Sequence, residues 1–117
     1  MTPAPIKPEI PFDTFAAVDV RVGTIVSVHD VAGSSKLVRF VVDFGDRRRT
    51  ILAGIKKERP DPQALAGRQA LFVVNLPPRT MASEVSEGML FDIGFADGIV
   101  PVLAVPESAV PNGTRCG

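Results

Sequence analysis

The residues best suited to bind a charged ligand are cations gathered in one stretch of the chain. Residues 36–59 hold eight basic and three acidic side chains, a net charge of +5, whereas residues 80–117 hold one basic and five acidic side chains, a net charge of −4. The whole chain is neutral, and strong nucleic-acid binders usually carry a basic excess. Segregated charge can still present a positive face to phosphate groups. The same charges also fit solvated strand edges and loops, so both interpretations stay open.

Catalytic or metal-binding chemistry has few residues to use. His29 is the only histidine and Cys116 the only cysteine, so a single chain lacks the ligands of a usual zinc site. A nucleophile–histidine pair would need Ser34, Ser35 or Ser86 beside His29, and no nucleophile elbow frames these serines. We therefore expect a protein that is not an enzyme and that uses no metal or cofactor.

Length and composition indicate one domain. The chain has 117 residues, and 45% of them are hydrophobic, which is enough for a packed core without disulfides. Residues 1–11 contain four prolines and no apolar run, so we expect a flexible leader rather than a signal peptide, followed by a domain at 12–117. A single cysteine and the lack of any long apolar segment predict a cytoplasmic protein without a membrane span.

Several short strands must position these side chains. Residues 12–17 could form one helical turn with Phe12 and Phe15 facing the core. A half-buried strand follows, whose period of two places five valines on one face, and Gly23 is expected to mark a bulge or bend in it. The five are Val18, Val20, Val22, Val26 and Val28.

The next strands have clearer turn signals. Residues 37–44 place Val38, Phe40, Val42 and Phe44 on one face, and Gly45-Asp46 predicts a hairpin to residues 49–53, with Arg47 and Arg48 at its tip. Residues 60–67 read as a short helix with Asp61 as N-cap. Strands are expected at 68–76, 89–95 and 99–105. The pattern predicts an all-β fold, either a small barrel or a β-sandwich.

Three motifs, in this order along the chain, carry a resemblance to a known family. They are DVRVGTI at 19–25, VNLPPR at 74–79 followed by SEGML at 86–90, and VPNGTR at 110–115. Together they resemble the tRNA-binding OB-fold family, which includes free-standing dimers and domains appended to methionyl- and phenylalanyl-tRNA synthetases. The segments DFG at 43–45, GIKK at 54–57 and PNGT at 111–114 favour a branch of small bacterial proteins described as export-related chaperones.

The resemblance implies a fold and two partners. The fold is a five-stranded OB barrel with a short helix between strands 3 and 4 and terminal extensions for dimerisation. The partners are tRNA and a second copy of the chain. The turn at 12–15 and the apolar segment from Ile99 onward would form the dimer interface, unless that segment is an edge strand tucked into its own barrel.

The family signature at residues 86–89 is the first part of the expected tRNA site, and it contains Ser86, Glu87, Gly88 and Met89. The Ser86 hydroxyl could contact a base edge or phosphate, Gly88 would allow close approach of RNA, and Met89 could lie against an unstacked base. The alternative is a turn serine and a core methionine.

Further site residues are basic or amide side chains near the same surface, namely Arg21, Lys36, Lys56, Lys57, Asn75 and Arg79. Arg21 could equally pair with Asp19 or Asp43. The chain has no Trp or Tyr, and its phenylalanines at 40, 44 and 72 fit the core, so we expect recognition of tRNA shape and backbone. The alternative function is a chaperone that binds unfolded or exported polypeptides, with the same groove open to both ligands.

Overall fold

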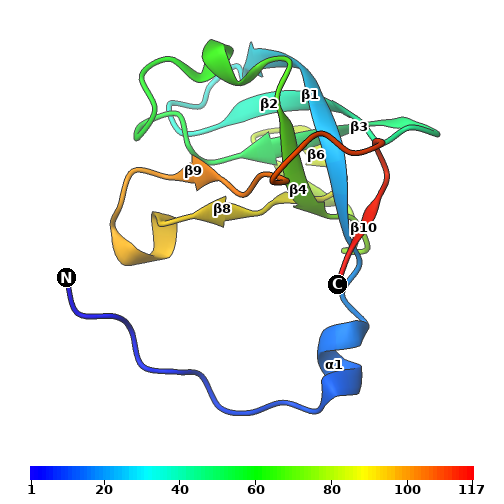
Figure 1. The fold of residues 1–117 in the computed structure, drawn as a ribbon. Coiled ribbons are helices and arrows are strands. Elements are labelled where there is room, and N and C mark those ends of the chain that lie inside the picture. The colour runs from blue at the N-terminus through cyan, green and yellow to red at the C-terminus, as the bar shows by residue number, and fades with distance from the viewer.

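One antiparallel sheet curls strongly into a half-barrel, as Figure 1 shows for the computed structural model, which describes residues 1–117. Strands β1 (Val20–Asp30), β2 (Val38–Asp43) and β3 (Arg48–Ala53) form a meander, and β4 (Gln69–Val73) pairs with the other side of β1. The strand order is β3-β2-β1-β4-β7, with β7 covering Met89–Leu90. This is the OB fold expected from the sequence.

The core confirms the period of two in the second strand. Val38, Phe40 and Val42 are fully buried, while the side chains between them are only partly covered. Phe40 and Phe72 are the largest side chains in the core, and Phe44 meets Phe72 edge-on with ring centroids 5.5 Å apart. The predicted hairpin to β3 is also confirmed.

The first strand departs from the predicted pattern. Its bulge lies between Ile25 and Ser27, not at Gly23, and the extra residue reverses which parity faces inward. Ile25 is therefore fully buried, whereas Val26, expected on the valine face, is 37% exposed. Gly23 has a different reason to be glycine, because an added Cβ would lie only 2.6 Å from Val42 Cγ1 in the core.

The predicted short helix lies between β3 and β4. It is the 3₁₀ helix η1 (Pro62–Leu65), whose Leu65 side chain is buried beneath the sheet. Asp61 occupies the N-cap position without a side-chain capping hydrogen bond. The turn after the helix reaches β1, where the Gly67 amide donates to the Ile25 carbonyl at 2.7 Å. Gly67 has φ +87°, a conformation that favours glycine.

The segment after β4 contains a hairpin that the sequence did not predict. Strands β5 (Arg79–Met81) and β6 (Glu84–Ser86) are joined through Ala82 and Ser83, both with positive φ. The longer strands expected at 89–95 and 99–105 break into β7, β8 (Asp92–Ile93), η2 (Phe95–Asp97) and β9 (Val102–Leu103). The last strand, β10 (Arg115–Cys116), pairs with the start of β1.

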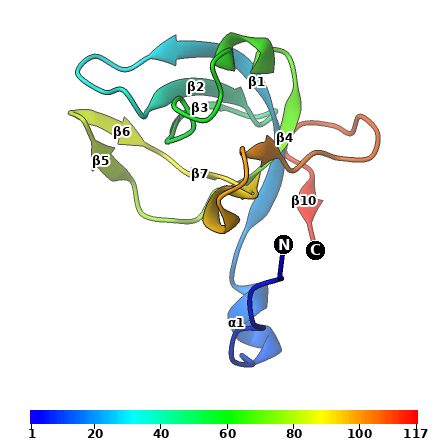
Figure 2. The same cartoon turned by 90° about the vertical axis from the view of Figure 1, so that its left-hand side faces the viewer.

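Helix α1 (Phe12–Ala16) of the N-terminal region lies apart from the barrel (Figure 2). Residues 1–10 form no regular secondary structure, and all of them are exposed. Helix α1 confirms the predicted turn, but Phe12 is 77% and Phe15 57% exposed, so the expectation that they face the core was wrong. Helix α1 buries none of its five residues. No helix has the length and apolar character needed to cross a bilayer.

Candidate nucleic-acid interface

Residues of the 86–89 motif form hydrogen bonds that connect the free edge of β3 to the segment leading into β7. The Glu87 amide donates to the Thr50 carbonyl at 2.8 Å, and the Glu87 carboxylate accepts from the Thr50 amide at 3.0 Å. The Ser86 Oγ accepts from the Leu52 amide at 2.9 Å. Two side chains therefore replace part of a backbone ladder at this edge, which we call the barrel seam.

Ser86 and Gly88 lie inside this seam. Ser86 is 3% exposed, and its hydroxyl also donates to the Gly88 carbonyl at 2.9 Å, so both of its hydrogen-bonding roles are used within the chain. A Cβ on Gly88 would lie 2.9 Å from the Val73 carbonyl oxygen. The expected contacts of these two residues with RNA stay untested, but the structure gives each a packing reason of its own.

Met89 is the member of the motif that faces outward. Its side chain is 46% exposed, so it is not the core methionine of the alternative interpretation. It lines a groove of about 640 Å³ with Arg79, Phe91 and Phe95, which we call the Met89 groove. Eight of the twelve residues around this groove are hydrophobic, while Lys7, Arg79 and Asp92 bring charge to it.

The predicted lysines gather at the far end of β1. The Lys56 amide donates to the Lys36 carbonyl at 3.0 Å, which joins the loop after β1 to the loop after β3. Lys56 Nζ pairs with Asp30 Oδ1 at 3.0 Å, and Lys57 is exposed beside it. One of these three lysines is thus engaged in an ion pair with a largely exposed carboxylate, and such pairs are weak.

Arg21 and Asn75 lie at the opposite end of β1 and hold local structure together. Arg21 binds the Asp19 carboxylate with both a 2.7 Å and a 3.0 Å hydrogen bond, which decides between the two partners considered for it. That hydrogen bond is the main cause that lowers the pKa of Asp19. Asn75 accepts from the Asp19 amide at 2.8 Å and donates to the Ala17 carbonyl at 2.7 Å.

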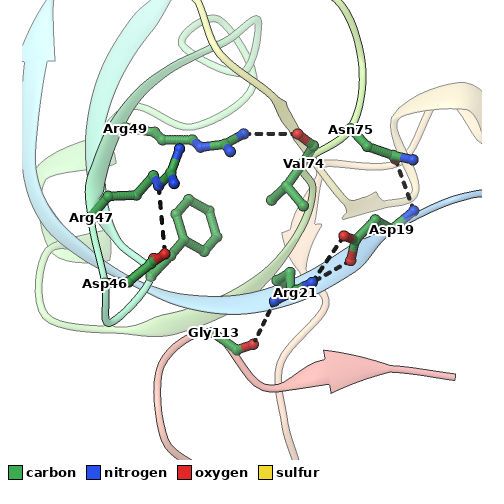
Figure 3. A pocket seen from close by; sticks show the side chains of 9 residues that line it. Asp19, Arg21, Asp46, Arg47, Arg49, Val74, Asn75 and Gly113 are labelled. Atoms are coloured by element: carbon green, nitrogen blue, oxygen red, sulfur yellow. Dashed lines mark hydrogen bonds and ion pairs between the residues drawn. The ribbon is translucent and has the colours of Figure 1, made fainter.

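Sequence reasoning missed a cleft beside these two residues. It has a volume of about 270 Å³ and three arginines in its wall, Arg21, Arg47 and Arg49 (Figure 3). Arg49 is anchored by a 2.8 Å hydrogen bond from Nη1 to the Val74 carbonyl, which lies 25 residues away in the chain. The run of three arginines at 47–49 indicated a basic site, but the sequence alone could not show that Arg49 contacts the Val74 carbonyl. We call this feature the arginine cleft.

The histidine has a partner that the sequence analysis did not consider. Ser27 Oγ and His29 Nε2 lie 2.8 Å apart, whereas no hydrogen bond joins His29 to Ser34, Ser35 or Ser86. Ser27 and His29 are alternate residues of β1, so their side chains project from the same face of the strand. His29 is exposed, and the hydrogen bond is that of two neighbouring polar side chains on an open strand face.

The predicted site residues thus lie in three places: the barrel seam with the Met89 groove, the lysine cluster at the end of β1, and the Arg21–Asn75 region at its start. OB folds bind oligonucleotides at the face of strands 2 and 3 and at the loops that follow strands 1 and 4. Lys36 lies in the first of these loops and Asn75 in the second, while Arg79 begins strand β5 directly after it. The fold and this placement define an OB-type binding domain.

Comparison with known proteins identifies the family. The family model described as "Putative tRNA binding domain" matches residues 20–115, and the chain belongs to this tRNA-binding domain family, as the sequence motifs predicted. A solved MetRS related protein from Pyrococcus horikoshii is 32% identical, with a TM-score of 0.86 over 95% of this chain and 100% of that one.

Two solved chaperones named CsaA are also similar. The protein from Bacillus anthracis is 30% identical, with a TM-score of 0.82 over 94% of this chain and 100% of its own. The protein from Picrophilus torridus is 27% identical, with a TM-score of 0.79 over 93% of this chain and 100% of its own. The predicted resemblance to the chaperone branch is confirmed by these matches.

Proposed function

We propose that this protein binds tRNA by its shape and backbone, acts by binding alone, and contacts the RNA beside the barrel seam. The observation that carries the proposal is the exposed Met89 beside Arg79, held in place by the buried hydrogen bond of Ser86 and the exposed one of Glu87 in a chain of the tRNA-binding domain family. Rigid support of this kind keeps a contact residue in a fixed geometry.

Basic side chains near the seam and at the end of β1 support the same assignment. The loops at one end of the barrel contain the positive charges of Lys36, Lys56 and Lys57. Arg79 adds a positive charge on the β5–β6 hairpin. Phosphate contacts of this type position an RNA without reading its sequence. The aromatic rings at Phe40 and Phe72 are fully buried, which leaves them no part in base stacking.

The first test is a titration of nuclease-treated protein with bulk tRNA at several salt concentrations, with duplex DNA as the comparison ligand. We expect saturable binding that prefers tRNA and weakens as salt rises, because phosphate contacts release counterions. Equal binding of duplex DNA, or no binding at low salt, would contradict the proposal.

The second test removes the proposed contacts. The double variant Met89→Ala, Arg79→Ala should weaken tRNA binding by about thirtyfold without unfolding, since each side chain contributes on the order of 1 kcal/mol and both are exposed. Arg68→Ala is the matched control, because Arg68 is an exposed arginine that lines neither the Met89 groove nor the arginine cleft. Equal affinity of the double variant and the control would show that the site is misplaced.

We also propose a homodimer, with α1 and the β8–β9 region as its interface. Both regions expose apolar side chains that their own barrel does not cover: Phe12 and Phe15 in α1, and Ile93, Phe95 and Val100 around β8 and β9. Exposed apolar groups of this extent are typical of a surface that binds a partner.

We further propose that residues 1–11 form a flexible leader to the domain at 12–117, and that the protein is cytoplasmic.

A second candidate function is a chaperone for unfolded or exported polypeptides, favoured by the apolar lining of the Met89 groove. Extended peptides bind such grooves through side-chain pockets and strand edges. The protein should then suppress aggregation of an unfolded client at equimolar ratio, and tRNA should compete with the client for the groove. Aggregation at the same rate with and without the protein would exclude this function.

A further inference from the structure

The arginine cleft carries a positive field that the barrel itself does not neutralise. Its wall contains Arg21, Arg47 and Arg49 against two carboxylates, Asp19 and Asp46 (Figure 3). The Asp19 carboxylate is fully engaged by the bidentate hydrogen bonds from Arg21. The pKa of Asp19 is lowered first by that hydrogen bond and then, against a raising effect of burial, by the charges of Arg21, Arg115 and Arg49. Cations therefore dominate this end of the barrel.

Arg49 is held in place with donors to spare. All of its hydrogen bonds within the chain use Nη1, at 2.8 Å to the Val74 carbonyl and 3.2 Å to the Glu87 carbonyl. Its guanidinium carbon lies 6.0 Å from the centre of the Phe44 ring. A guanidinium has five N–H donors, so the groups on Nε and Nη2 remain for a ligand.

Arg47 supplies a second, free cation to the same cleft. Its side chain is 63% exposed, and its one carboxylate neighbour is Asp46 at 3.6 Å, itself 74% exposed. Solvated pairs at this distance contribute little and are readily exchanged for a better anion. The cleft is therefore lined by one guanidinium that is held in place, that of Arg49, and one that can move, that of Arg47.

We infer that the arginine cleft binds a backbone phosphate of the RNA, with Arg49 and Arg47 as the contacts. Guanidinium groups match the geometry of phosphate oxygens with paired N–H donors. The volume of about 270 Å³ is below the roughly 300–1,000 Å³ of sites for drug-sized ligands, so it suits a phosphate with part of its sugar. The inference rests on the proposed function and adds a contact that the 86–89 motif and the lysines do not supply.

The position of the cleft determines how the RNA lies on the protein. Arg21 stands at the start of β1, whereas Lys56 pairs with Asp30 at its end. Nine residues of strand separate these points, a span of at most about 30 Å. An RNA held at both ends would run from one end of the barrel to the other, in the direction of β1.

The test compares Arg47→Ala with Arg48→Ala in the full chain. Arg48 is the next residue, is exposed, pairs with Asp43 in the β2–β3 ladder and does not line the cleft, so its loss removes the same charge from the same hairpin. We expect Arg47→Ala to weaken tRNA binding by roughly fivefold and to reduce the slope of log affinity against log salt by about 0.7–0.9. Arg48→Ala should leave both close to the wild-type values.

Failure of the inference and failure of the proposed function give different results. If wild-type protein does not bind tRNA, the proposed function falls and the inference with it. If the wild type binds tRNA and the two arginine variants match each other in affinity and slope, the cleft is not an RNA contact, while tRNA binding stands.

A further arm separates backbone phosphate from free phosphate. Inorganic phosphate is titrated at constant ionic strength while the Gly113 amide is followed by NMR, because Gly113 lines the cleft. Weak, unsaturated shifts together with the Arg47→Ala effect on tRNA support the backbone assignment. Tight saturation by inorganic phosphate with unchanged tRNA binding by Arg47→Ala would overturn it.

Discussion

Apolar side chains are buried in one region of the molecule and exposed in another. The first region is the wall formed by β1–β4, and the second is formed by α1, β8 and β9. In the wall, Phe40, Phe72 and Ile51 are fully buried by the chain itself. In the second region, Phe12 is 77% and Val100 56% exposed. The first region completes its own packing, whereas the second presents apolar surface outward. The difference indicates that stability resides in the barrel, and that the proposed dimer would form at its periphery.

The largest expected effect comes from the wall. Phe40→Ala should destabilise the protein by about 3–5 kcal/mol, because it removes a fully buried ring and leaves a cavity in the core. Chemical denaturation of the wild type and the variant measures the difference. A loss below about 1 kcal/mol would contradict the idea that the barrel completes its own packing.

A smaller effect is expected at the barrel seam. Ser86→Ala removes the acceptor of the Leu52 amide and the donor to the Gly88 carbonyl, so it should cost about 1–3 kcal/mol. The same variant should weaken tRNA binding only through the altered placement of Met89. Ser83→Ala, at the exposed turn of the β5–β6 hairpin, serves as the control for loss of a hydroxyl. Unchanged stability of Ser86→Ala would mean that the seam does not depend on this side chain.

Substitutions at the periphery should change the oligomeric mass of the protein rather than the stability of the barrel. Phe12→Ser with Phe15→Ser should change the free energy of unfolding of the monomer by no more than about 0.5 kcal/mol, since both rings are exposed. Light scattering should show the wild type as a dimer and the variant as a monomer at micromolar concentration. A monomeric wild type would show that the exposed rings do not serve assembly.

The smallest effect concerns the Asp19–Arg21 pair at the cleft. Because the folded state lowers the pKa of Asp19 through the Arg21 hydrogen bond, ionised Asp19 contributes stability above its unfolded pKa of about 3.9. That contribution is lost as the pH falls through the lower pKa of the folded state. The stability advantage of the wild type over Asp19→Asn should therefore be constant near neutrality and shrink below about pH 4. A stability difference between the wild type and Asp19→Asn that stays constant below pH 4 would exclude this coupling.

Local patterns predicted the parts of the fold that are locally determined. The alternation of Val38, Phe40 and Val42 and the turn at Gly45 specify β2 and its hairpin without reference to distant residues. The bulge in β1 could not be predicted, because it is a property of the pairing with β2. The β5–β6 hairpin escaped detection because Ala82 and Ser83 replace the glycine or asparagine that usually adopts positive φ.

The candidate site was only partly predictable for a related reason. The motif at 86–89 predicted a site in this segment, but the burial of Ser86 accompanies a hydrogen bond with Leu52, 34 residues away, which the motif does not show. The arginine cleft depends on the contacts of Arg49 with Val74 and Glu87, 25 and 38 residues away. Side-chain types indicated which ligand the protein favours, whereas the tertiary contacts decide which side chains can reach it.

The construction of the barrel seam also has a consequence for local motion. Its closure depends on hydrogen bonds of the Ser86 and Glu87 side chains, one backbone hydrogen bond at Thr50 and the bond from Arg49 Nη1 to the Glu87 carbonyl. Separating the edge of β3 from this segment therefore breaks few bonds and leaves the β2–β3 ladder intact. Such an opening is a local event, with a free energy below that of global unfolding. The amides of Thr50 and Leu52 therefore report the opening directly by hydrogen exchange, and a ligand that braces Met89 slows their exchange without touching them.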